Sequence, residues 1–272
     1  MPELAEVETI RRGVEAVFVG RLVESAEVTG ARSVRRHPPS RLAEVAVGRR
    51  LVAAGRRGKY LLLHLEGGDV VVAHMGMSGQ MLRAPADSLR LPHTQVTLGF
   101  SGGDDLRFVD PRTFGQMFAT TAELPELAHL GFDPIAEPIG AADLARRLAG
   151  RRTRLKALLM DQRFVAGIGN IYSDEILFAA RLGPARPASS LTPAEARRLH
   201  RAIGGVLSAA IELRGSSLPD SRYRDLYGET GSYQYRHAVY GRAGRACPRC
   251  RSEIARVRYG GRSGFFCPRC QT

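Results

Sequence analysis

The chain has 272 residues, of which 44% are hydrophobic, so it can form two domains or one large domain with an ordinary core. Its formal net charge of +13 indicates a nucleic acid or another polyanion as partner, and a merely solvated basic surface is the less favoured reading. The sequence contains no apolar run of membrane-spanning length and no signal peptide, so we expect a cytoplasmic protein without a membrane partner.

The first predicted element is a helix that begins near Glu3. Its apolar residues recur at helical spacing, at Leu4, Val7, Ile10, Val14 and Val17. Removal of Met1 would leave Pro2 with a free secondary amine, and the positive end of the helix should lower the pKa of that amine. Glu3 would then place a proton-shuttling carboxyl beside a nucleophile. The alternative is an ordinary helix-entry pattern, in which Pro followed by Glu has no chemical role.

The region after this helix is predicted to be β-rich. Short β-like runs separated by Gly-rich turns cover residues 21–28, 59–65, 69–73, 94–100, 106–109 and 116–120. Such a series favours a β-sandwich.

Three polar or flexible segments interrupt these strands, at residues 56–59, 74–79 and 110–115. Each could be an ordinary solvated or packed loop. Together they suit a surface that bends DNA, because apolar wedges can unstack a base step while a nearby Arg reads exposed base edges.

The second half of the chain is predicted to be helical after a linker. Residues 123–140 contain three Pro and two Gly, and helices are expected at 141–148, 153–160, 172–180 and from Thr192 to about 213. The turn at 167–172, which opens the third of these helices, could bind a phosphate through its backbone amides. Several basic residues between 151 and 156 strengthen that interpretation.

The last segment contains all four Cys residues in two pairs. The spacing of Cys247 and Cys250, followed by Cys267 and Cys270, is typical of a structural zinc site with four Cys ligands. Such a site leaves no coordination position open, so we expect one zinc ion with a role in folding. The residues between the pairs are predicted to form a hairpin with Arg262 near its tip.

Several strings in the sequence together resemble the formamidopyrimidine-DNA glycosylases, a sister family of the endonuclease VIII glycosylases. The strings are PELAEVE, RRGKYLL, HMGMSG, DPRTFG, GIGNIYSDE, VYGR and CPRC…RSGFFCPRCQ. They occur in order from Pro2 to Gln271, so the resemblance covers the whole chain.

The resemblance implies an α+β fold in four parts. These are an N-terminal β-sandwich domain with flanking helices (1–125), a linker (126–140), a helical domain with a helix-two-turns-helix motif (141–237), and a β-hairpin zinc finger (238–272). It also implies a monomer that binds damaged double-stranded DNA. The segment 215–234 matches the loop that covers the extruded base.

The resemblance further implies roles for individual residues. Pro2 would be the Schiff-base nucleophile, Glu3 its acid–base partner, Lys59 an aid at the substrate, and Arg262 a phosphate clamp that assists the last elimination. The expected DNA contacts are His74, Met77, His93, Arg112, Phe114, Arg151, Asn170 and Tyr240. Among these, Met77, Arg112 and Phe114 would fill the space left by the extruded base.

The implied activity is a base-excision-repair DNA glycosylase that removes 8-oxoguanine and formamidopyrimidines, with AP lyase activity by β,δ-elimination. Two alternatives stay open: an endonuclease VIII-type enzyme for oxidised pyrimidines, and a non-catalytic zinc-finger DNA-binding protein. The sequence departs from the family pattern at Ala5, where Pro is usual, and at Gly264, where Thr, Ser or Ala is usual. The first change could loosen the first helical turn and the second the placement of Arg262.

Overall fold

The computed structural model describes residues 1–218, 223–259 and 261–272, in two compact units. The first unit comprises Met1–His129 and Leu213–Gln234, and the second comprises Leu130–Glu212 and Tyr235–Thr272. Residues 213–234, which the sequence placed with the helical domain, therefore pack in the first unit. Residues 219–222 of the expected base-covering loop lie outside the described residues. None of the described helices is long and apolar enough to cross a membrane.

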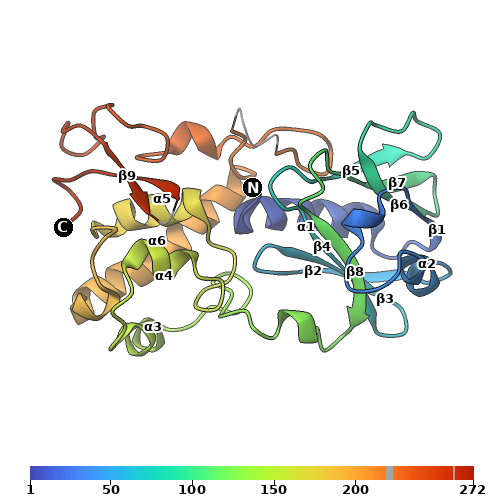
Figure 1. Cartoon of the computed structure of the whole chain (residues 1–272), viewed down its shortest axis with the longest axis horizontal. Coiled ribbons are helices and arrows are strands. Elements are labelled where there is room, and N and C mark those ends of the chain that lie inside the picture. The colour runs from blue at the N-terminus through green and yellow to red at the C-terminus, as the bar shows by residue number, and fades with distance from the viewer. Residues whose placement is uncertain (219–222, 260) are drawn as a thin grey trace. The chain divides into compact units, whose positions relative to one another are not determined.

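The first unit contains two antiparallel four-stranded sheets, so the expected β-sandwich is confirmed (Figure 1). One sheet has the order β1-β6-β7-β5, formed by Val23–Val28, Thr94–Phe100, Asp104–Val109 and Gln80–Pro85. The other has the order β2-β3-β4-β8, formed by Leu51–Arg57, Tyr60–Leu65, Asp69–His74 and Gln116–Thr121. Strands β2 and β5 were not predicted, because each contains Arg and a turn-forming residue, which interrupt the alternation of apolar and polar residues that marks a strand.

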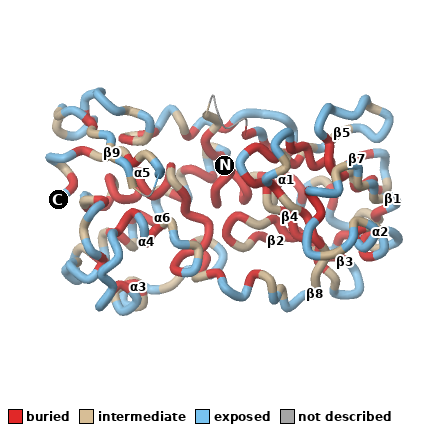
Figure 2. The backbone as a smooth tube through the Cα atoms, viewed as in Figure 1, coloured by how far each residue is buried: buried red, intermediate tan, exposed pale blue. Residues whose placement is uncertain are grey.

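Helix α1 (Leu4–Phe18) supplies much of the core of this unit. Ile10, Val14 and Phe18 are fully buried and belong to a core cluster with residues from both sheets. Figure 2 shows the stretch of the tube around α1 mainly in the colour of buried residues. A second helix, α2 (Ser40–Ala46), and the short 3-10 turns η1 (Ala31–Ser33) and η2 (Pro125–Leu127) complete the elements between Met1 and His129. The amphipathic pattern of α1 therefore fixes which way its N-terminus, with Pro2 and Glu3, enters the domain.

The second unit is helical and ends in a two-stranded hairpin. Its elements are α3 (Ala141–Leu148), α4 (Leu155–Met160), α5 (Asn170–Ala180), η3 (Ala188–Ser190), α6 (Pro193–Glu212), η4 (Tyr233–Arg236, which begins in the first unit), β9 (Ala255–Tyr259) and β10 (Arg262–Phe266). The predicted start of α6 is confirmed: the N–H of Thr192 donates to the Glu195 carboxylate at 2.8 Å, and the N–H of Glu195 donates back to Thr192 Oγ1 at 3.3 Å.

Helix α5 is the central element of the second unit. Nine of its 11 residues are buried, including the acidic side chains of Asp174 and Glu175. Buried carboxylates need partners, and here the partners come from α4, from the segment before the hairpin and from β10. Segments that are distant in sequence are thus tied to one helix.

Candidate functional site

The N-terminus of α1 holds Pro2 and Glu3 in a buried position. Glu3 is the N-cap residue and is 3% exposed, and its N–H donates to the Glu6 carboxylate at 2.8 Å. This capping box closes the first helical turn although Ala5 stands where Pro is usual. Met1 precedes Pro2 in the structure, so the Pro2 nitrogen becomes a secondary amine when Met1 is removed.

The Glu6 carboxylate also reaches the segment after α6. Its other oxygen accepts the N–H of Ser216 at 2.7 Å. Gly215 allows this approach, because a Cβ at this position would lie only 2.7 Å from Glu6 Oε1. The backbone φ of Gly215 is +78°, a conformation that favours glycine. Sequence reasoning did not find Glu6. The available signal was that Glu6 follows Glu3 by three residues, because this is the spacing of the two side chains in a capping box.

Lys59 lies in the β2–β3 turn and is 6% exposed. The turn is tied to α1 through Arg56, whose Nε donates to Glu8 at 3.0 Å and whose Nη1 donates to the Gly58 carbonyl at 3.1 Å. Burial raises the pKa of Glu8, but the hydrogen bonds from Arg11 and Arg56 outweigh it and keep that pKa below its usual value. The ionised Glu8 thus places the turn of Lys59 against the helix that carries Glu3.

His74, the last residue of β4, is positioned as a hydrogen-bond donor. Its Nδ1 accepts the N–H of Gly76 at 3.1 Å, so in the neutral ring the proton is on Nε2. Burial, together with the cations Lys59 and Arg35, lowers the pKa of His74 to about 4. The ring is therefore neutral at pH 7, with its Nε2–H as the donor that a phosphate oxygen would need.

The loop 75–79 and the turn 110–115 share one anchor, the fully buried Asp110. One carboxylate oxygen accepts a hydrogen bond from the Ser78 hydroxyl at 2.6 Å, and the other accepts one from the N–H of Gly115 at 2.7 Å. The backbone N–H of Arg112 is a weaker third donor at 3.3 Å. The loop and the turn also touch directly, because a Cβ on Gly76 would lie 2.5 Å from the backbone of Gly115.

Asp110 therefore holds together the two segments that carry the expected insertion residues. Met77 and Phe114 are 42% and 53% exposed, and Arg112 is exposed with its guanidinium 5.7 Å from the centroid of the Phe114 ring. The exposed His93 is adjacent, because its carbonyl accepts the N–H of Asp110 at 2.9 Å. Two exposed apolar side chains and an exposed Arg, on segments that share a buried polar anchor, are suited to insertion between bases.

In the second unit, the Gly-rich turn before α5 is braced by Gln162. The Gln162 side chain accepts the N–H of Gly167 at 2.8 Å and donates to the carbonyl of Ile168 at 2.8 Å. Asn170 begins α5, where helix-terminal N–H groups favour an anion. The exposed Arg151 lies after α3, in the same unit, with its guanidinium over the Phe164 ring.

Tyr240 is positioned by Glu175 of α5. The Glu175 carboxylate accepts the backbone N–H groups of Ala238, Val239 and Tyr240 at 2.9, 3.0 and 2.8 Å. The Tyr240 ring packs edge-on against Phe265 of β10, with centroids 5.2 Å apart. Glu175 was not singled out from the sequence, although it belongs to the GIGNIYSDE string.

Arg262 begins β10 and is exposed, directly opposite Tyr259 of β9. The structure gives a reason for the departure at Gly264. A Cβ at this position would lie 2.9 Å from the Tyr259 ring and 3.2 Å from Lys156 Cδ, so glycine is the residue that fits under Tyr259.

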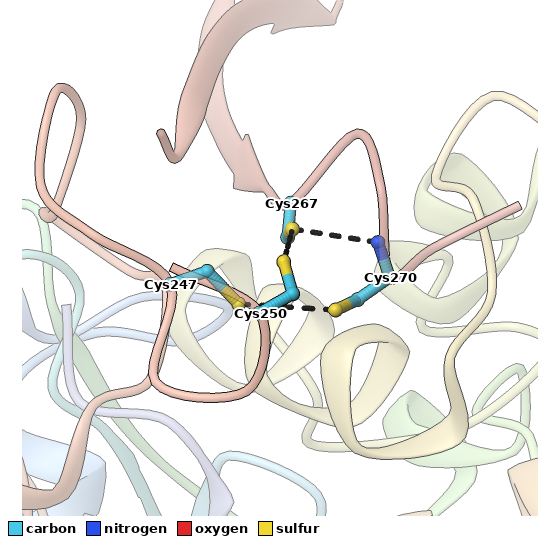
Figure 3. A group of neighbouring side chains, drawn as sticks. All are labelled: Cys247, Cys250, Cys267 and Cys270. Atoms are coloured by element: carbon cyan, nitrogen blue, oxygen red, sulfur yellow. Dashed lines mark hydrogen bonds between the residues drawn. The ribbon is translucent and has the colours of Figure 1, made fainter. Parts of the chain in front are cut away.

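The four Cys residues converge from two segments, as Figure 3 shows. All four Sγ atoms lie within 4.8 Å of one another, with Cys247 and Cys270 3.9 Å apart and Cys250 and Cys267 3.5 Å apart. Tetrahedral coordination with metal–sulfur bonds of about 2.3 Å requires sulfur–sulfur distances of about 3.8 Å. The N–H groups of Arg249 and Cys270 point at sulfur atoms at 3.4 Å, as expected around thiolate ligands. The site therefore fits a tetrahedral structural metal.

Comparison with known proteins matches three successive segments to one family. Residues 1–117 match the formamidopyrimidine-DNA glycosylase N-terminal domain, residues 130–221 match the formamidopyrimidine-DNA glycosylase H2TH domain, and residues 244–272 match the zinc finger found in FPG and IleRS.

Individual relatives agree with these matches. A formamidopyrimidine-DNA glycosylase of Thermus thermophilus is 46% identical over 262 residues, which cover 94% of this chain and 93% of the relative. A Lactococcus lactis FPG mutant solved with Fapy-dG-containing DNA is 33% identical with a TM-score of 0.92, covering 99% of both chains. Complexes of Lactococcus lactis Fpg with DNA containing an abasic site or an oxidised pyrimidine are 33% identical with TM-scores of 0.91, also covering 99% of both chains.

The order of the three segments, the extent of the identity and the four clustered Cys residues lead to the same assignment. This chain belongs to the formamidopyrimidine-DNA glycosylase family and is a DNA glycosylase of base excision repair.

Proposed function

We propose that this protein removes oxidised purines, namely 8-oxoguanine and formamidopyrimidines, from duplex DNA and then cleaves the abasic site by β,δ-elimination. The observation that carries this proposal is the pairing of Pro2 and Glu3 at the buried start of α1, held by the Glu6 capping box. A secondary amine beside a carboxyl, at the positive end of a helix, is a suitable covalent catalyst for sugar chemistry. The complex of a relative with Fapy-dG-containing DNA supports the purine substrate.

The lesion must first leave the base stack, at a cost of a few kcal/mol. Met77 and Phe114 would fill the vacated space, while Arg112 would hydrogen-bond the orphaned base. Their exposure and the shared Asp110 anchor support this role, because a wedge must be both accessible and held rigidly.

The chemistry then proceeds on the sugar. The Pro2 nitrogen attacks C1′ while Glu3 protonates the opening ring oxygen, and the base departs with the glycosidic electron pair. The resulting iminium has no N–H to lose, so it remains cationic and acts as the electron sink for loss of the 3′ phosphate and then of the 5′ phosphate. The complex of a relative with abasic DNA is consistent with an abasic site as the second substrate.

Each unit has its own expected phosphate contacts. Lys59, His74 and His93 lie in the first unit, and the second unit holds Arg151, Asn170, Tyr240 and Arg262. The neutral Nε2–H form of His74 supports a donor role, and the helix start at Asn170 supports an anion site. One zinc ion held by Cys247, Cys250, Cys267 and Cys270 would stabilise the fold of the finger, since four thiolates leave no open position.

A cleavage panel tests this function. Duplexes with 8-oxoguanine, a formamidopyrimidine, thymine glycol or an abasic site are incubated with the protein, and the released bases and strand products are quantified. We expect the two purine lesions and the abasic site to be processed, with both phosphates eliminated. An enzyme that leaves the purine lesions intact would contradict the substrate, and one that excises them without cutting the strand would contradict the lyase step.

Oxidised pyrimidines are the second candidate substrate class. The observation that favours them is the complex of the Lactococcus lactis relative with oxidised-pyrimidine DNA. The thymine glycol arm of the panel decides between the two classes, because an endonuclease VIII-type enzyme would process it faster than 8-oxoguanine. A non-catalytic DNA-binding protein would leave all four duplexes uncut.

A further inference from the structure

The hairpin that carries Arg262 is seated on a buried polar network that the catalytic proposal does not use. Lys156 of α4 and Asp174 of α5 form an ion pair at 2.7 Å, and each side chain is 1% exposed. Lys156 Nζ also lies 3.4 Å from the carbonyl of Asn170 and 3.3 Å from Ser173 Oγ. The pair is thus attached to the first turn of α5, where Asn170 lies.

The second oxygen of Asp174 reaches the hairpin. It accepts the backbone N–H of Phe265 in β10 at 3.0 Å. The aliphatic part of Lys156 lies beneath Gly264, since a Cβ on that glycine would be 3.2 Å from Lys156 Cδ. One buried ion pair therefore contacts both the backbone and one face of the strand that begins with Arg262.

Tyr259 covers the same face of the hairpin. It lies directly opposite Arg262 in the β9–β10 register, and Arg262 and Gly264 are two residues apart on one strand, so all three share a face. The Tyr259 ring occupies the space where a Gly264 side chain would be, with ring carbons 2.9 and 3.0 Å from a Cβ built there. A large ring on the neighbouring strand, diagonal to a residue without a side chain, restores the packing that the glycine alone would lose.

We propose that Tyr259 and Gly264, seated on the Lys156–Asp174 pair, are positioning residues that set the direction of Arg262. The proposal rests on the proposed function, in which Arg262 holds a phosphate for the last elimination. Lys156 links the carbonyl of Asn170 to the hairpin, so the two expected phosphate contacts at Asn170 and Arg262 are held in a fixed relation. Gly264 has no side chain of its own, and the Tyr259 ring from the opposite strand fills the space beside it.

The test enlarges the side chain at position 264 and shortens the one at position 259, in the full-length, zinc-loaded protein. Gly264→Ala should displace the Tyr259 ring, and Tyr259→Val should uncover Gly264. Each should lower affinity for a duplex with a stable abasic-site analogue and shift strand products toward β-elimination alone. We expect about tenfold, within the range that a displacement of about 1 Å produces. The double variant Gly264→Ala with Tyr259→Val should recover most of both losses.

A double-mutant cycle with Arg262→Gln separates positioning from general stability. If the pair acts through Arg262, neither Gly264→Ala nor Tyr259→Val should change the product ratio further once Arg262 is replaced. Losses that add to that of Arg262→Gln, or that accompany loss of bound zinc, would overturn the proposal. Asp143→Asn, in an exposed pair with Arg146 on α3, is the matched control and should change neither readout.

The phosphate role of Arg262 and its positioning by Tyr259 and Gly264 can be tested separately. An unchanged product ratio and affinity in Arg262→Gln would remove the phosphate role of Arg262, and with it the proposal. A normal loss in Arg262→Gln, with no effect of either size change, would overturn the positioning proposal alone and leave the proposed function intact.

Discussion

The two units of this protein differ in how they use charge. The first unit contains 19 Lys and Arg against 18 Asp and Glu, whereas the second contains 21 against 9, so the second unit carries +12 of the net charge of +13. In the first unit most cations have a carboxylate partner, as Arg56 has Glu8 and Arg83 has Asp104. In the second unit three of the nine carboxylates, those of Asp133, Asp174 and Glu175, are buried and hydrogen-bonded within the fold.

This difference separates two tasks. Unpaired positive charge draws DNA by releasing counterions, without regard to sequence or lesion. Reaction at a sugar carbon needs a few groups with controlled protonation, which a nearly neutral and internally paired surrounding provides. We therefore expect changes in the first unit to alter base excision and lesion choice, and changes to exposed cations of the second unit to alter affinity. The hairpin of Arg262 is the exception, because it is also proposed to affect the last elimination. The following experiments test that expectation.

Blocking the Pro2 nitrogen should have the largest effect. A retained Met1 or an N-terminal tag converts the amine to an amide, which cannot form an iminium. We expect loss of the borohydride-trapped protein–DNA adduct and a fall in base excision of at least about a thousandfold, as for other removed nucleophiles. Affinity for lesion-containing duplex should be nearly unchanged, because it depends mainly on the second unit.

The control is the protein with Met1 removed, whose adduct should map to the N-terminal peptide. Normal excision by the blocked protein would rule out Pro2 and make Lys59 the next candidate. Glu3→Gln should reduce excision but spare cleavage of a preformed abasic site, whose sugar opens without help.

Loss of the metal site should have the next largest effect, on binding. Cys250→Ser removes one of four ligands, and metal binding in such a site supplies folding free energy directly. We expect the variant to lose bound zinc, part of its folded content and most of its DNA affinity, while the sheet signal of the first unit persists. The measurements are zinc content, circular dichroism and binding anisotropy. A zinc-free protein with unchanged melting and binding would contradict a structural role.

Breaking the buried Lys156–Asp174 pair should destabilise the second unit. Lys156→Met leaves the Asp174 carboxylate buried without its cation, which typically costs about 3–5 kcal/mol of unfolding free energy. Denaturant unfolding measures the change. Asp143→Asn breaks an exposed pair in the same unit and should cost less than about 1 kcal/mol. Equal losses of unfolding free energy in the two variants would show that the buried pair contributes no more to stability than the exposed one.

Replacing Arg112 should change the preference for the base opposite the lesion, without a comparable effect on DNA affinity. An Arg beside a wedge residue can donate to the acceptors of cytosine, and such contacts discriminate bases by about 1–3 kcal/mol. We expect excision of 8-oxoguanine to be faster opposite C than opposite A, and Arg112→Ala to narrow that ratio. The measurement is the ratio of single-turnover rates on the two duplexes. A ratio that the substitution leaves unchanged would refute the assignment.

The smallest effect concerns the salt dependence of binding. Arg151→Gln in the second unit should weaken binding to all duplexes similarly and reduce the slope of log affinity against log salt by about 1. Arg90→Gln is the matched change in the first unit, where Arg90 is paired with Glu27, and should leave the slope unchanged. If Arg90→Gln changes the slope as much as Arg151→Gln does, the separation of charge between the units does not govern binding.

The sequence by itself determined the local features of this protein. The Cys spacing predicted the metal site, the apolar periodicity predicted α1, and the Thr192–Glu195 pattern predicted the start of α6, because each depends on residues a few positions apart. The ordered motifs also indicated the family. The strands β2 and β5 were missed because Arg56 is buried by a partner 48 residues away and β5 has a mixed pattern.

The tertiary structure decided which polar groups hold the expected site residues. Asp110 joins the segments of Met77 and Phe114, Glu6 joins the start of α1 to Ser216, and Asp174 joins α5 to β10. The distant partners lie 32 residues from Asp110, 91 from Asp174 and 210 from Glu6, so no spacing in the sequence reveals these contacts. Buried charge must find hydrogen-bond donors wherever the folded backbone brings them, and that choice is made only when the whole chain has packed.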